Sequence, residues 1–152
     1  MHRTLKRSLF IAAVVALGSV AVTASAHNAL SGSGHAVPLS NSSCFSESYG
    51  SITNNCAGAQ LFEIPLDAST NLWGYLNATI SAYGATSSNN VGCTAIGVNS
   101  DITAAWGGSY TYLSAFGAPQ TITLPGAYVP GGGSGYIACY INQGGRINVV
   151  NF

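Results

Sequence analysis

Short runs of β-forming residues, separated by Gly, Pro, Asn and Ser, decide which folds this chain can adopt. No stretch of ten or more residues combines a helical apolar period with good capping residues. About eight short runs between turn residues instead predict an all-β fold, a two-sheet antiparallel β-sandwich of jelly-roll or immunoglobulin-like kind. The clearest run extends from Leu72 to Tyr83, where strict alternation predicts one continuous, half-buried strand.

A closed outer-membrane barrel is the alternative fold, because the sequence ends in Phe152. Arg146 and Asn148 disfavour it. Both occupy positions where the alternation counted back from Phe152 requires an apolar, lipid-facing side chain.

The stretch from Gly135 to Phe152 consists of two β-rich runs on either side of a Gly-Gly turn, which predicts a hairpin. Ile137, Cys139 and Ile141 lie on one face of its first run, because side chains alternate along a strand. We expect these three side chains to point into the core of the protein.

The N-terminus has the pattern of a secretory signal peptide: a basic start, an apolar centre and the small residues Ala24-Ser25-Ala26 before the expected cut. Cleavage after Ala26 makes His27 the first mature residue. The predicted organisation is a signal peptide over 1–26, a flexible Gly- and Ser-rich arm over 27–43 and a β-sandwich domain over 44–152. The expected location is therefore secreted: extracellular, at the cell surface or in a periplasm.

The charge of the mature chain excludes two classes of partner. Beyond residue 26 the only Lys or Arg is Arg146, against four carboxylates, so the formal net charge is −3. Proteins that bind nucleic acid or anionic membranes need clusters of Lys and Arg, so we expect neither partner. No second apolar stretch is long enough for a transmembrane helix in the mature chain.

The cysteine count predicts two disulfides, since an exported chain meets an oxidising environment and all four cysteines follow the signal peptide. The favoured pairs are Cys44–Cys56, which closes a short polar loop, and Cys93–Cys139, which joins two strand-like runs. No C-x₂-C spacing is present, so the cysteines do not indicate a zinc site.

The sequence contains no recognisable catalytic constellation, so we expect a protein that is not an enzyme and needs no cofactor or metal. Nothing in the sequence fixes two of the carboxylates (Glu47, Glu63, Asp67 and Asp101) in a shared cleft, and Glu63 is interpreted as an edge carboxylate. No G-x-S-x-G nucleophile motif is present, and the glycines at 131–135 lack the lysine and helix of a phosphate-binding loop.

A copper site is the one specific catalytic alternative. If cleavage exposes His27, its α-amino group and imidazole can chelate copper, and a second histidine would complete the site. In this respect the chain resembles the copper-dependent polysaccharide mono-oxygenases, which also carry their site on a β-sandwich. Those enzymes take the second histidine from far along the chain, whereas here the only other mature histidine is His35, eight residues on in the same arm.

Outward-facing aromatic residues give the best functional lead. Trp73 and Tyr75 lie opposite the inward face of the long strand, and Tyr136 and Tyr140 lie opposite Cys139. Such rings have flat apolar faces and polar edges that suit stacking on sugar rings. If the two strands share a sheet, the four side chains predict a single strip of rings that binds ligand.

The function that follows is a secreted, non-catalytic binding module, with carbohydrate or another extracellular surface as the first partner to test. A self-associating subunit of a surface fibre or coat is the alternative, because a lysine-free, charge-poor β-chain lacks the usual protection of its sheet edges. A small secreted enzyme with the N-terminal histidine copper site is the third.

Overall fold

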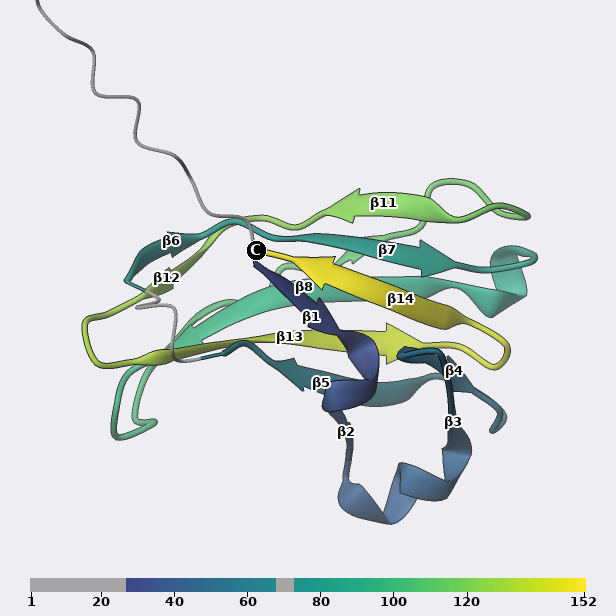
Figure 1. The fold of residues 1–152 in the computed structure, drawn as a ribbon, viewed down its shortest axis with the longest axis horizontal. Helices are drawn as coiled ribbons and strands as arrows, with labels where there is room; N and C mark the ends of the chain where they lie inside the picture. Colours follow the sequence, from purple (N-terminus) through teal and green to yellow (C-terminus); the bar gives the residue numbers. More distant parts are fainter. Residues whose placement is uncertain (1–26, 68–72) are drawn as a thin grey trace, which may run out of the picture.

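The computed structural model describes residues 27–67 and 73–152 and confirms the predicted two-sheet antiparallel β-sandwich (Figure 1). The predicted signal peptide and Leu72, the first residue of the predicted long strand, lie outside the described residues. Within the described part of the chain, no helix is long and apolar enough to cross a membrane.

Two six-stranded sheets form the body of the molecule (Figure 1). Sheet A has the order β11 (Gln120–Thr123), β7 (Thr79–Tyr83), β14 (Arg146–Asn151), β4 (Ser51–Asn54), β3 (Phe45–Ser48), and β1 (Asn28–Leu30) also pairs with β14. Sheet B has the order β10 (Thr111–Tyr112), β8 (Val91–Val98), β13 (Ser134–Ile141), β5 (Gln60–Pro65), β2 (His35–Val37), and β9 (Ala105–Gly107) also pairs with β8. A third sheet pairs β12 (Ala127–Val129) with β6 (Gly74–Leu76).

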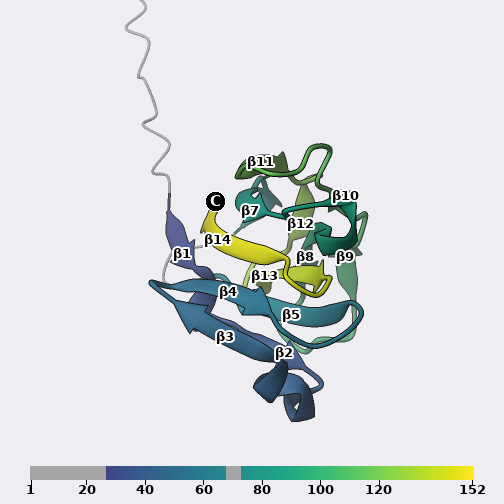
Figure 2. The same cartoon turned by 90° about the vertical axis from the view of Figure 1, so that its right-hand side faces the viewer.

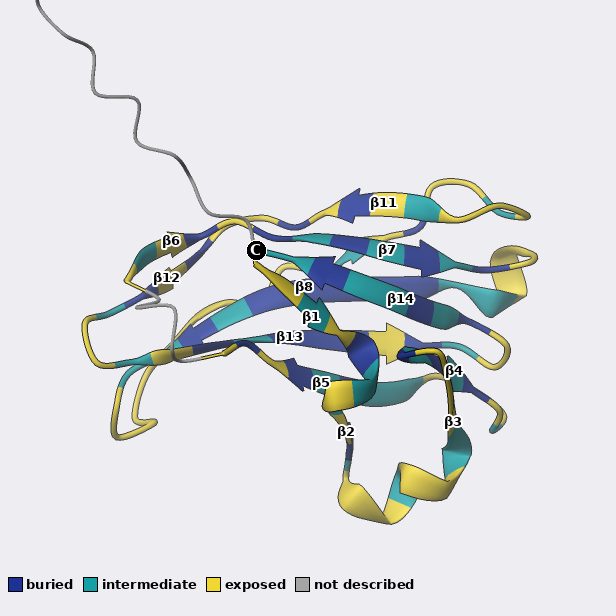
Figure 3. Cartoon of the chain, viewed as in Figure 1, coloured by how far each residue is buried: buried dark blue, intermediate teal, exposed yellow. Residues whose placement is uncertain are grey.

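The core lies between the two large sheets and is built from alternating strand residues. Ile80 in β7 and Ile147 in β14 meet Val91 in β8 and Ile137 in β13, and all four side chains are fully buried. The buried and intermediate bands that alternate along β7 in Figure 3 reflect this two-residue period. Inward-facing apolar residues therefore set the orientation of each sheet and leave its other face available to solvent.

Both predicted disulfides are present. Cys93 and Cys139 face each other on adjacent strands, β8 and β13, and both are fully buried on the inward face of sheet B. Cys44 and Cys56 close the base of the β3–β4 hairpin.

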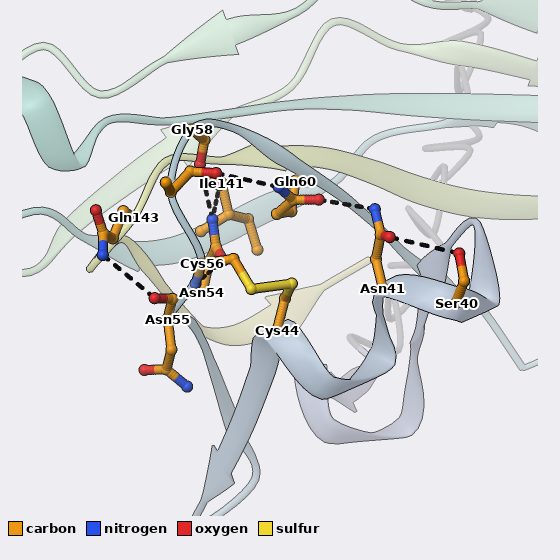
Figure 4. The surroundings of a disulfide bond; sticks show 11 residues. Ser40, Asn41, Cys44, Asn54, Asn55, Cys56, Gly58, Gln60, Ile141 and Gln143 are labelled. Carbon is orange, nitrogen blue, oxygen red and sulfur yellow. Dashed lines mark hydrogen bonds between the residues drawn. A yellow bond between two sulfur atoms is a disulfide. The ribbon is translucent and has the colours of Figure 1, made fainter.

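Next to this hairpin, the buried Asn54 side chain donates to the carbonyl oxygen of Ile141 at 2.7 Å and to that of Gly58 at 3.0 Å (Figure 4). Because Ile141 belongs to β13 and Asn54 to β4, this amide connects the two sheets. The hairpin is therefore held both by its disulfide and by the core.

The predicted C-terminal hairpin is wrong. β13 and β14 follow each other in the chain, but β13 belongs to sheet B and β14 to sheet A. β13 has β8 on one side and β5 on the other, so it offers no free edge to β14. The turn with Gly144, which has a φ of 76°, instead carries the chain from one sheet to the other. The predicted inward face of Ile137, Cys139 and Ile141 is confirmed.

The predicted single strand over 72–83 is also wrong, although its alternation is correct. The chain forms β6 and then β7, and the two strands belong to different sheets. Leu76, Ala78, Ile80 and Ala82 are all buried, as the alternation required. Alternation specifies which side chains point inward, but it does not specify which neighbour a strand pairs with.

The predicted flexible arm over 27–43 is instead part of the sandwich. β1 pairs with β14 in sheet A, and β2 pairs with β5 in sheet B. Ser31, between them, is fully buried, and its hydroxyl lies 2.9 Å from the carbonyl oxygens of both Gly50 and Ile147. These contacts satisfy a buried polar group and fix the segment against both sheets.

Candidate functional site

The outward side of β13 carries two of the predicted site residues. Tyr136 and Tyr140 point away from the core, because they alternate with the buried Ile137, Cys139 and Ile141. Tyr140 is 40% exposed, and Tyr136 is partly exposed. β13 is a central strand of sheet B, so both rings lie over the middle of that sheet.

Two further tyrosines extend this surface from the edge of the sheet. β10, labelled in Figure 2, pairs with β8 at the edge of sheet B. In the register of these strands Tyr112 lies opposite Gly92, which in turn lies opposite Tyr140. The Tyr110 ring lies between its neighbours, with its centroid 5.2 Å from that of Tyr140 and 6.4 Å from that of Tyr112. We call the surface made by Tyr110, Tyr112, Tyr136 and Tyr140 the tyrosine face.

The rings of the tyrosine face are arranged as a platform. Tyr110 is inclined by 38° to Tyr140 and by 33° to Tyr112, so the Tyr110 ring plane is closer to parallel than to perpendicular with each neighbour. Small residues lie beneath them: Gly92, Thr94 and Ala138 are on the outward side of the sheet and are nevertheless buried.

Gly92 determines how closely one ring approaches the backbone. A methyl group built on Gly92 would overlap the ring atoms of Tyr112. The Tyr112 ring therefore lies against the β8 backbone, while 51% of the residue remains exposed to solvent.

One carboxylate lies next to the tyrosine face. Glu63 in β5 is opposite Ala138 of β13 on one side and opposite His35 of β2 on the other. Its carboxylate is 3.7 Å from Nε2 of His35, and 26% of its side chain is exposed.

Burial and the Glu63 carboxylate both raise the pKa values of two tyrosines of this face, Tyr110 and Tyr136. Burial raises the pKa of Tyr110 above its usual value of 10.0, and Tyr140, Tyr112 and Glu63 add to the rise. Burial also raises the pKa of Tyr136, and Glu63 adds to it. The phenols of Tyr110 and Tyr136 are therefore neutral hydrogen-bond donors and acceptors near pH 7.

The other two predicted residues, Trp73 and Tyr75, lie at a different place. Tyr75 in β6 pairs with Tyr128 in β12, and their ring centroids are 5.8 Å apart. Trp106 contacts Tyr128 edge-on at 5.8 Å, and Trp73 lies beside Gly131. We call Trp73, Tyr75, Trp106 and Tyr128 the end cluster.

The predicted single strip is thus divided between two surfaces. Trp73 and Tyr75 are each 77% exposed, and among the described residues no ring contact joins the end cluster to the tyrosine face. The rings of the end cluster meet at 65° and 82°, so they make an irregular surface and not a flat one.

Sequence reasoning missed Tyr110, Tyr112 and Glu63 as members of one site. The alternating sequence Tyr-Thr-Tyr at 110–112 is the signal that could indicate that both rings lie on one side of a strand. What it could not indicate was the pairing of β10 with β8, which puts these rings beside Tyr140.

In the described residues, neither the grooves nor the potential metal ligands form a second site as well organised as the tyrosine face. One shallow groove of about 430 Å³ is lined by β1 and residues 65–67, and another of about 270 Å³ lies between β2 and β3. Within the described residues no group of three or more His, Cys, Asp or Glu side chains converges. His27 contacts the Phe152 ring at 5.8 Å, while His35 faces Glu63, so the copper hypothesis stays a prediction without a converging ligand set in the described chain.

No protein-family model matches the sequence, and no curated protein matches it. The fold is similar to part of a family two carbohydrate esterase from Cellvibrio japonicus, with a TM-score of 0.50 and 9% identity over 84% of this chain and 33% of that chain. It is also similar to part of a GH26-CBM35 β-(1,4)-mannanase from Podospora anserina, with a TM-score of 0.54 and 10% identity over 83% of this chain and 27% of that chain. The chain spans about a third and about a quarter of these proteins, and at such identities the similarity shows the fold alone.

Proposed function

We propose that this chain is a secreted, non-catalytic module that binds polysaccharide on its tyrosine face. The observation that carries the proposal is the contact of the Tyr110 ring with both Tyr112 and Tyr140, at inclinations below 40°, over small buried residues. Flat aromatic surfaces stack on the C–H faces of sugar rings, and phenol hydroxyls bond sugar hydroxyls at the rim. A row of such rings across neighbouring strands suits an extended chain of sugars.

Two other observations support this proposal. The two solved structures with a similar fold are, by their names, a carbohydrate esterase and a mannanase with a carbohydrate-binding module. The two disulfides are typical of proteins that work outside the reducing cytosol.

Retention on insoluble polysaccharides tests the proposal. We expect cellulose, mannan, xylan or chitin to retain the protein, and the variant Tyr112→Ala/Tyr140→Ala to lose about tenfold or more in affinity. A nucleic-acid base stacked on an aromatic side chain contributes on the order of 1–3 kcal/mol to binding. We expect a similar contribution from a sugar ring stacked on a tyrosine.

The matched control is Trp73→Ala/Tyr75→Ala, which removes two exposed aromatic rings from the end cluster. Unchanged retention of the tyrosine-face variant, or equal loss in both variants, would refute the assignment of the site.

A self-associating subunit is the second candidate, favoured by the exposed edge strand β11. Its sequence Gln-Thr-Ile-Thr carries no charge or proline that would prevent pairing with another chain, and it forms one end of sheet A. A control sample of the retention experiment that contains no polysaccharide distinguishes self-association from ligand binding. Protein that sediments there by itself would favour assembly, whereas protein that stays in solution would favour ligand binding.

A further inference from the structure

The Glu63 carboxylate lies beside the tyrosine face, although the binding of a neutral sugar does not require a negative charge. Glu63 is one strand away from the β13 tyrosines and lies opposite Ala138, which is between Tyr136 and Tyr140 along β13. The rise of the Tyr110 and Tyr136 pKa values includes a contribution from this carboxylate, so both hydroxyls lie within its electrostatic reach.

Among the described residues, no Lys or Arg lies beside the tyrosine face. Arg146 is the only Lys or Arg in residues 27–152, and it belongs to β14 in the opposite sheet. Its guanidinium lies 5.1 Å from the Tyr83 ring centroid and is therefore occupied on that side of the molecule. His35, at 3.7 Å, is the basic group that faces Glu63 in the described structure.

We infer that the tyrosine face selects aminated, cationic sugars, such as glucosamine units of a polysaccharide, over neutral or N-acetylated ones. The inference rests on the proposed function and adds to it the chemical class of the ligand. An ammonium group over tyrosine rings gains cation–π attraction, and a carboxylate beside the rings adds an ion pair and a charge-assisted hydrogen bond. A neutral sugar gains the stacking contribution and the phenol hydrogen bonds, but neither of these electrostatic contributions.

The partial exposure of Glu63 sets the size of the expected preference. An exposed or partly exposed ion pair contributes up to about 1 kcal/mol, which corresponds to about fivefold in affinity. Because salt screens such a pair, the preference should decrease as ionic strength rises.

The test compares glucosamine oligomers with N-acetylglucosamine oligomers of the same length by isothermal titration, at low and at high ionic strength. The wild-type protein should bind the aminated oligomer about fivefold more tightly at low ionic strength. Glu63→Gln should abolish the salt-dependent part of the preference, because the carboxylate is lost while the rings that provide cation–π attraction remain. A native circular-dichroism spectrum would show that the variant is folded.

Glu47→Gln is the matched control, because it removes the same charge from β3, in the opposite sheet, and should keep the preference. Equal affinity of the wild-type protein for both oligomers, or a preference that Glu63→Gln leaves undiminished, would overturn the inference and leave the proposed function intact. So would binding of neither oligomer by a protein that another polysaccharide retains. Failure of every polysaccharide to retain the protein would refute the proposed function, and the inference with it.

Discussion

At the scale of single residues, the platform depends on Gly92 as much as on the tyrosines. The Tyr112 ring occupies the space where any side chain at position 92 would begin. The φ angle of Gly92 is not positive, so the backbone conformation does not require glycine here. Glycine is required because the Tyr112 ring approaches the backbone closely. A single methyl group at this position should therefore act on ring placement.

We predict that Gly92→Ala displaces Tyr112 and weakens polysaccharide retention about as much as Tyr112→Ala does. Overpacking of this kind typically lowers the free energy of unfolding by about 1–3 kcal/mol, which urea denaturation would measure. The double variant Gly92→Ala/Tyr112→Ala is the control. Since both changes act through the same ring, its retention should be no weaker than that of Tyr112→Ala alone, and additive losses would contradict this explanation.

The sequence was sufficient for some of these residues and not for others. Tyr136 and Tyr140 could be placed on the outward side because they alternate with Cys139 along one strand. Tyr110 and Glu63 could not be placed beside them, since that depends on pairing between strands far apart in the chain. The role of Gly92 could not be foreseen either, because it follows from a ring that packs across from β10.

At the scale of elements, the disulfide between β8 and β13 holds together the two strands that support the platform. β8 contributes Gly92, and β13 contributes Tyr140, directly opposite it. The other disulfide, between Cys44 and Cys56, ties the base of a hairpin in sheet A. The two bridges thus have different expected effects on stability.

We predict that Cys93→Ala/Cys139→Ala destabilises the protein more than Cys44→Ala/Cys56→Ala. Loop-closure entropy gives about 4 kcal/mol for the sequence separation of 46 and about 3 kcal/mol for the separation of 12. The buried pair also leaves a cavity in the core, which adds to its cost. Chemical denaturation of both variants would measure the difference, and a larger loss for the hairpin pair would contradict it.

Elements were easier to predict than their partners. The inward face of β13 follows from local alternation. The separation of β13 and β14 into two sheets does not, because a strand with both edges already paired cannot accept its sequence neighbour. The same limit explains why the run over 72–83 divides between two sheets.

At the scale of the whole molecule, the β-sandwich presents its two outer faces with different chemistry. Sheet B carries the tyrosine face and Glu63, whereas the outward side of sheet A carries hydroxyl and amide groups such as Ser81 and Asn148, which hydrogen-bond to each other at 3.1 Å. The described structure thus offers one organised aromatic platform, supported by a rigid core and a buried disulfide. The proposed binding of an extended ligand depends on this platform.

Solution NMR titration with soluble oligosaccharides of cellulose, mannan, xylan and chitosan tests this account most directly. Saturable shifts should concentrate on the backbone amides around Gly92, Tyr112 and Tyr140, with much smaller changes around Trp73 and Tyr75. Shifts that concentrate on the end cluster, or no shifts with an oligosaccharide whose polymer retains the protein, would contradict the tyrosine face as the binding site.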